Sequence, residues 1–136
     1  QGVGLPTVKV PFWPGVRKLE RQMPDFRFQS SITENAMDYA YFSLTNPALK
    51  EKGLKLVVAF DHRNFRLEVW LSGVNRTAQY RWAEQWSVCP PPMELTQEPN
   101  RTDFVVRLPV ETDLSDGEKT VAAVKEAAVQ LLQLLP

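Results

Sequence analysis

Cysteine and histidine are almost absent from this chain. Its 136 residues include one cysteine, Cys89, and one histidine, His62. A single cysteine excludes an intrachain disulfide, and these two residues are too few for a zinc site built from cysteine and histidine. The six glycines are scattered, and none belongs to the Gly-Lys-Ser/Thr sequence of a phosphate-binding loop. The sequence therefore predicts no metal site and no cofactor.

The chain also has no surplus of charge and no long apolar run. Its 16 basic residues balance its 16 acidic ones, whereas nucleic-acid-binding domains usually carry extra Lys and Arg for phosphate contacts. No stretch approaches the ~20 apolar residues needed to span a bilayer. The N-terminus lacks the basic region and apolar run of a signal peptide. We therefore expect a cytoplasmic protein with no membrane contact and no nucleic-acid partner.

The residues that are present are typical of a folded domain. Apolar residues make up 43% of the chain and charged residues 24%, which is ordinary for a globular protein. A chain of this length can bury one core without disulfides. We expect residues 1–136 to form a single α+β domain, with a mostly antiparallel sheet of about five strands and helices packed on one face.

Apolar periodicity predicts the order of the elements. Alternating apolar and polar residues predict strands at 26–33, 37–44, 54–60, 65–71 and 103–110. Helices are predicted at 14–23, at 75–86 behind an Asn75 cap, and at 115–135 behind a capping box that begins at Ser115. Residues 87–101 contain four prolines and no periodicity, so they are predicted to form a loop.

The hairpin between residues 54 and 71 allows a register to be derived. With a loop at 61–64, Phe60 faces Phe65 and Val58 faces Leu67, so every pair on that face is apolar. The opposite face is mixed, with Lys55 on one strand and Trp70 on the other. We expect the apolar face to be buried and the mixed face to be the outer one.

Two stretches of the sequence resemble a known family. MDYAYFSL at 37–44 and LKEKGLKLVVAFDHRNFRLEVWLSGVNR at 49–76 are similar to segments of a family of small uncharacterised bacterial proteins. The resemblance implies a shared fold and a bacterial cytoplasmic setting, but no activity. The positions that match the family pattern are Asp38, His62, Arg66, Glu68, Trp70, Asn75 and Arg76.

The outer face of the hairpin is the first place to expect a ligand. A tryptophan there must either lie under another element or meet a ligand, and the more frequent case is burial under a helix, here the Trp82/Trp86 helix or the C-terminal helix. The alternative is a shallow pocket with an aromatic floor and a few polar groups. The candidate ligand-binding residues are Lys55, His62, Arg66, Glu68, Trp70, Asn75 and Arg76.

A divalent-metal nuclease is a weaker hypothesis. Asp61 and Glu68 supply two carboxylates, but Trp70 stands where a nuclease motif would place a lysine. In the derived register the two carboxylates lie about 13–14 Å apart along the strand, at ~3.4 Å per residue. Metal–oxygen bonds of ~2 Å do not bridge that distance. Asp61 is then expected to shape the turn, and Glu68 to pair with a neighbouring cation.

These observations leave the specific function unknown. The leading hypothesis is a non-enzymatic binding or interaction domain that uses the outer face of the central hairpin. The alternative is a small hydrolase-like enzyme that acts on a polar metabolite or phosphodiester through Arg66 and Glu68. The partner is expected to be a small polar ligand or another protein, and a homodimer remains open.

Overall fold

Seven strands and four helices make up the part of the chain that the structure describes. The computed structural model describes residues 15–28, 33–34, 39–61, 66–86, 89–98, 102, 104–112 and 115–135. Its strands are β1 (Arg27–Phe28), β2 (Thr33–Glu34), β3 (Tyr39–Thr45), β4 (Leu54–Asp61), β5 (Arg66–Gly73), β6 (Glu94–Leu95) and β7 (Val106–Val110). Its helices are α1 (Val16–Gln22), α2 (Pro47–Glu51), α3 (Arg76–Gln85) and α4 (Gly117–Leu132).

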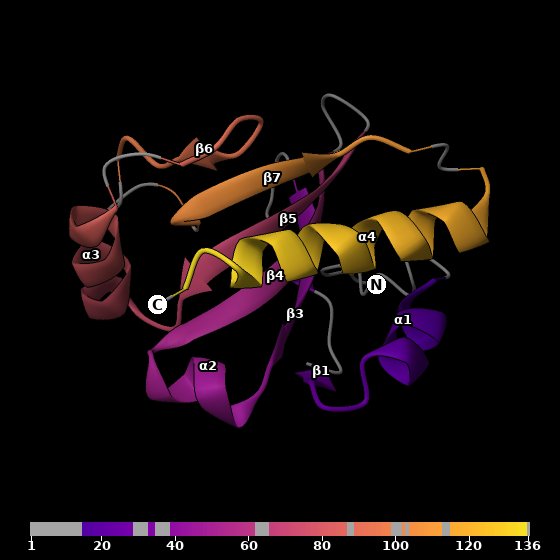
Figure 1. The fold of residues 1–136 in the computed structure, drawn as a ribbon, viewed down its shortest axis with the longest axis horizontal. Helices are drawn as coiled ribbons and strands as arrows, with labels where there is room; N and C mark the ends of the chain where they lie inside the picture. Colours follow the sequence, from indigo (N-terminus) through magenta and orange to yellow (C-terminus); the bar gives the residue numbers. More distant parts are fainter. Residues whose placement is uncertain are drawn as a thin grey trace, which may run out of the picture.

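The strands form one antiparallel sheet in the order β1-β3-β4-β5-β7-β6, and β2 also pairs with β3. Figure 1 shows this sheet with α4 lying across β4 and β5 and α3 standing near the ends of β5 and β7. The predicted α+β class and mostly antiparallel sheet are confirmed. The strand count exceeds the predicted five, since β6 forms inside the segment expected to be a loop, and two separate strands, β1 and β2, are described where the sequence predicted one at 26–33.

The register of the central hairpin differs from the predicted one by two residues. Asp61 pairs with Arg66 and Phe60 with Leu67, whereas the sequence suggested Phe60 opposite Phe65. Phe65 and the rest of 62–65 lie outside the described residues. Because side chains alternate with period two, a shift of two residues leaves each side chain on its predicted face. The predicted faces were right, and the predicted cross-strand partners were wrong.

One face of the sheet carries the main core, and all four helices contribute to it. The central positions of this face, Leu56, Val58 and Val69, are at most 1% exposed. The residues that the helices add are Leu19 from α1, Leu49 from α2, Trp82 from α3, and Val121, Val124, Ala127, Ala128 and Leu131 from α4. The prediction that the helices pack on one face is therefore confirmed.

Two helix caps fix where α3 and α4 begin. The Asn75 side-chain oxygen accepts a hydrogen bond from the Ala78 N–H at 2.8 Å, which confirms the predicted cap of α3. For α4 the cap is Asp116 rather than Ser115. The Asp116 carboxylate accepts from the Glu118 and Lys119 N–H groups, both at 3.1 Å. The sequence prediction erred by one residue, because Ser115 and Asp116 are both good caps and stand side by side.

A second, smaller apolar cluster lies on the opposite face of the sheet. It contains Val57, Ala59, Trp70 and Phe104, with Tyr41 packed against them. The alternation of the strand predicted at 103–110 places Phe104 on the inward face with Val106 and Leu108. Phe104 points outward instead, since the chain bends at Val105 just before β7 begins. This outer cluster supports the candidate site.

Candidate functional site

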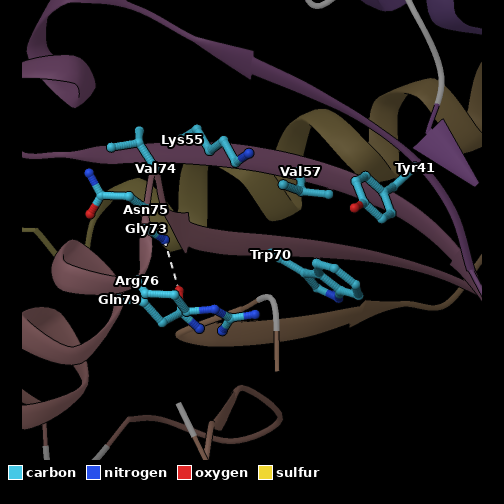
Figure 2. A pocket seen from close by; sticks show the side chains of 9 residues that line it. All are labelled: Tyr41, Lys55, Val57, Trp70, Gly73, Val74, Asn75, Arg76 and Gln79. Atoms are coloured by element: carbon cyan, nitrogen blue, oxygen red, sulfur yellow. Dashed lines mark hydrogen bonds between the residues drawn. The ribbon is translucent and has the colours of Figure 1, made fainter. Parts of the chain in front are cut away.

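A pocket of about 230 Å³ opens on the outer face of the sheet, beside the first turn of α3. Lys55 and Val57 of β4, Trp70 of β5 and Tyr41 of β3 form one part of its wall. The β5–α3 connection and the first turn of α3, which begins at Arg76, form the other part. Figure 2 shows the Lys55 and Arg76 side chains reaching from opposite sides toward the end occupied by Tyr41 and Trp70.

Trp70 provides the aromatic floor of this pocket, and aromatic neighbours hold it in place. Its ring centroid lies 5.9 Å from that of Tyr41 and 5.6 Å from that of Phe104, with tilted planes. Trp70 is 3% exposed. The expectation that the Trp82/Trp86 helix or the C-terminal helix covers it was wrong, because Trp82 and α4 pack into the core on the other face.

Glu68 fixes the edge of the Trp70 indole. The indole Nε1 donates to Glu68 Oε1 at 2.8 Å, and Arg66 Nε donates to Glu68 Oε2 at 3.0 Å. A second cation, Arg107, lies 4.0 Å from Oε1. The Glu68 side chain is fully buried. Buried carboxylates need such partners, since an isolated charge in a protein interior is costly.

Arg107 extends this network to the edge of the sheet. It forms an ion pair with Glu94 of β6, and its guanidinium carbon lies 4.8 Å from the centre of the Phe104 ring. The cation–π contact holds Phe104 against the outer face. Glu68, Trp70, Phe104 and Arg107 therefore form one continuous support beneath the pocket.

Arg76 and Asn75 come from the first turn of α3. Arg76 is exposed, and its Nη1 donates to the Thr102 carbonyl at 2.7 Å, which restrains the guanidinium. In Figure 2 the Asn75 side chain turns away from the Lys55 and Arg76 head groups, which agrees with its role as the cap of α3. Lys55 is half-buried on β4. Four predicted residues, Lys55, Trp70, Asn75 and Arg76, thus line one pocket.

Of the remaining three predicted residues, two lie outside the pocket and one is not described. Arg66 and Glu68 are bound to each other on the far side of Trp70 and do not line the pocket. His62 lies outside the described residues. The site residues are therefore brought together in part, with Arg66 and Glu68 reaching the pocket only through the indole they support.

Gln79 and Tyr41 line the pocket and were missed by sequence reasoning. Gln79 is 2% exposed, and its side-chain oxygen accepts from the Gly73 N–H at 3.0 Å. Its nitrogen donates to the carbonyls of Phe104 at 2.7 Å and Thr102 at 3.1 Å. The available signals were weak: Gln79 follows Asn75 by one helical turn, and Tyr41 lies in an alternating strand.

Asp61 and Glu68 lie closer together along the strands than the sequence predicted. Asp61 ends β4 opposite Arg66 and is 3% exposed, so it does not form the turn as predicted. Its strand offset from Glu68 is two residues, about 7 Å, rather than the 13–14 Å derived from the sequence. Even so, no group of three His, Cys, Asp or Glu side chains able to hold a metal ion occurs among the described residues.

Cys89 stands apart from the pocket. Its thiol donates to the Met93 carbonyl at 3.3 Å. Burial, and secondly the nearby Glu94 charge, raise the pKa of the Cys89 thiol above its usual range. A raised pKa keeps the thiol protonated at neutral pH, and a protonated thiol is a weak nucleophile.

These features define a small antiparallel α+β domain with a cationic, aromatic-walled pocket on one face of its sheet. The chain belongs to the family described as Domain of unknown function (DUF7000), whose model matches residues 16–135. The predicted membership of an uncharacterised family is thereby confirmed. No curated protein and no solved structure shows significant similarity to the chain. None of the helices in the described ranges combines the length and apolar character needed to cross a membrane.

Proposed function

We propose that this domain binds a small polar ligand in the pocket and acts as a non-enzymatic binding module. The observation that carries the proposal is the placement of two cationic side chains, Lys55 and Arg76, beside the aromatic floor made by Trp70 and Tyr41. Ligand pockets typically combine an apolar wall with a few convergent polar groups. The support beneath Trp70 fixes the floor in advance, which lowers the entropy cost of binding.

The enzyme alternative has less support. It requires Arg66 and Glu68 to reach a substrate, yet Glu68 is fully buried and its two oxygens already accept from Arg66 and Trp70. Among the described residues that line the pocket, none is Asp, Glu, His, Cys or Ser. General acid–base and nucleophilic catalysis most often draw on those side chains, and only Lys55 and Tyr41 of the described lining belong to other types that serve in catalysis. We therefore assign Glu68 the role of holding Trp70.

A protein partner, including a second copy of the chain, is the other occupant to consider for this face. Analytical ultracentrifugation distinguishes it, because a homodimer would raise the sedimentation coefficient with protein concentration. We further propose a bacterial, cytoplasmic setting, which is supported by the resemblance of residues 37–44 and 49–76 to bacterial proteins.

A screen of small metabolites by protein NMR tests the binding proposal. We expect a ligand to shift the Trp70 indole signal together with the amides of residues 73–76. Lys55→Ala or Arg76→Ala should each weaken that ligand by about tenfold, the size of one lost charge-assisted hydrogen bond. Lys50→Ala and Arg17→Ala, which remove exposed cations from α2 and α1, are the matched controls. Shifts confined to other surfaces, or none from the library, would contradict the proposal.

A further inference from the structure

We propose that the hydroxyl group of Ser72 binds the ligand at the base of the pocket, and that the ligand is a single unsaturated ring bearing a neutral hydrogen-bonding group such as a hydroxyl. This inference rests on the proposed function, because it specifies the ligand class of the same pocket. It is supported by the unpaired state of a buried hydroxyl, by the position of Ser72 beneath the pocket, and by the size of the cavity.

Ser72 is a buried residue of β5 whose hydroxyl is unpaired. It is 1% exposed, and its Oγ has no hydrogen-bond partner in the part of the chain that the structure describes. Other buried polar side chains nearby are satisfied, since Glu68 accepts through both oxygens and Gln79 bonds through both ends of its amide. Buried polar groups without a partner are few in folded proteins, and a bound molecule is one of the reasons for them.

Ser72 lies on the outer face of the sheet, beneath the pocket. Side chains alternate along β5, and Ser72 follows Trp70 by two residues, so both lie on the outer face. Its cross-strand partner on β4 is Lys55. Trp70, Lys55 and the next residue of β5, Gly73, all line the pocket (Figure 2). Ser72 itself does not line it, so its hydroxyl lies one layer below the surface of the cavity.

Access to the Ser72 hydroxyl depends on the Lys55 side chain. Cross-strand neighbours hold their Cβ atoms about 4.5–5.5 Å apart, so the four-carbon stem of Lys55 is long enough to cover Ser72. Lys55 is half-buried, and side chains that reach the surface change rotamer within picoseconds to nanoseconds. In the bound state the Lys55 stem moves aside and the polar group of the ligand takes its place above Ser72. A serine hydroxyl both donates and accepts, so it pairs with a neutral hydroxyl and needs no charge on the ligand.

The volume of the cavity limits the ligand to a single ring. A dry cavity of about 150 Å³ accommodates benzene, and drug-sized ligands occupy roughly 300–1,000 Å³. The 230 Å³ of this pocket lies between these values, which leaves room for one ring and one small polar group. Trp70 and Tyr41 offer aromatic surface to the ring, while the hydroxyl of the ligand reaches Ser72.

Phenol and toluene test the role of Ser72, because they differ only by a hydroxyl in place of a methyl group. NMR titrations of the wild-type protein and of Ser72→Ala give four affinities, each from the shifts of the Trp70 indole and the amides of residues 73–76. The ratio of phenol affinity to toluene affinity should be about fivefold lower in Ser72→Ala, the size of one lost neutral hydrogen bond. Comparing ratios cancels the difference in hydrophobicity between the two compounds.

Two controls separate binding from folding. Ser72→Ala should keep or raise the melting temperature of the ligand-free protein, because it removes an unpaired buried hydroxyl. Ser43→Ala makes the same change on the outer face of β3, opposite Val57 and outside the pocket lining. It should leave the ratio of phenol affinity to toluene affinity unchanged.

An unchanged ratio in Ser72→Ala would overturn the inference and leave the binding proposal intact. A clear fall in the melting temperature of Ser72→Ala would also overturn it, since the hydroxyl would then serve the fold. If neither phenol nor toluene shifts the pocket signals, the inferred ligand class is wrong. The binding proposal is then judged separately, by whether the metabolite library yields any other ligand of the pocket.

Discussion

Glu68 is the charged side chain on which the outer face of the sheet depends. It is fully buried, and its two oxygens accept from one cation and one indole. Arg66, its ion-pair partner, keeps 40% of its side chain exposed. The pair is thus asymmetric: water can solvate Arg66 when Glu68 is lost, whereas Glu68 has little access to water when Arg66 is lost. The contribution of Arg66 to stability is therefore larger than that of a cation in an exposed surface ion pair.

Arg66→Ala should lower the free energy of unfolding by about 1–2 kcal/mol, because the hydrogen bond that it removes serves a buried carboxylate. Urea denaturation measures this change. Arg17→Ala, at an exposed position of α1, should change stability by less than about 0.5 kcal/mol. Arg66→Ala should also leave ligand affinity in the pocket nearly unchanged. A loss of binding with no loss of stability would instead favour the enzyme alternative, in which Arg66 contacts the substrate.

At the scale of the elements, the sequence predicted which face of the sheet each side chain lies on better than which residues pair across the strands. Every apolar residue of the buried face of β4 can meet any apolar residue of the same face of β5. Burial therefore decides whether odd-numbered or even-numbered positions face the core. Registers that differ by two residues bury the same face and are nearly equal in apolar burial. The observed register, Asp61 with Arg66, places Asp61 in the strand rather than the turn. Strand β6 has two residues, too few for any alternation to be visible.

The candidate site was predictable to the same degree. Lys55 and Trp70 follow from the alternation of the hairpin, and Asn75 follows from its capping position. That they share a pocket with Arg76 depends on how α3 docks against the end of the sheet. The docking contacts run through Gln79 to Gly73, Thr102 and Phe104. The contacts to Thr102 and Phe104 join segments distant in sequence, and no local pattern encodes them.

At Gly73, the last residue of β5, the backbone of α3 lies very close. A Cβ at this position would lie 2.5 Å from the Gln79 backbone nitrogen, and backbone atoms cannot move aside cheaply. Gly73→Ala should therefore destabilise the protein by about 1–3 kcal/mol, the usual cost of overpacking, and should displace the first turn of α3. Differential scanning calorimetry and the NMR shifts of residues 73–79 measure both effects.

Gly117 provides the control for Gly73. It begins α4, and apart from its chain neighbours and the backbone of α4 itself, no heavy atom of the described residues lies within 4 Å of a Cβ built there. Gly117→Ala should leave stability unchanged or raise it by up to about 1 kcal/mol, because alanine reduces the entropy of the unfolded chain. Equal effects at Gly73 and Gly117 would show that the close approach of α3 to β5 is not as described.

At the scale of the whole molecule, the sheet carries two apolar clusters, one on each of its faces. The main core collects residues from all four helices on one face. The outer cluster around Trp70 rests on the other face of the same strands. Val57 of the outer cluster and Val58 of the core are neighbours on β4, so a displacement of this strand disturbs both clusters at once. We propose on this ground that the chain folds as one domain.

A single cooperative unfolding transition is the expected consequence, as is usual for domains under about 150 residues. Fluorine NMR of protein labelled with 5-fluorotryptophan reports on each face separately, since Trp70 belongs to the outer cluster and Trp82 to the main core. The native signals of Trp70 and Trp82 should disappear at the same urea concentration, together with the far-ultraviolet circular dichroism. Trp86, which packs against Trp82 with ring centroids 5.1 Å apart, should follow the same curve.

Loss of the Trp70 signal at a lower urea concentration than that of Trp82 would mean that the outer face opens independently of the core. The pocket would then sit on a separately melting layer, and ligand binding would stabilise the Trp70 transition without moving that of Trp82.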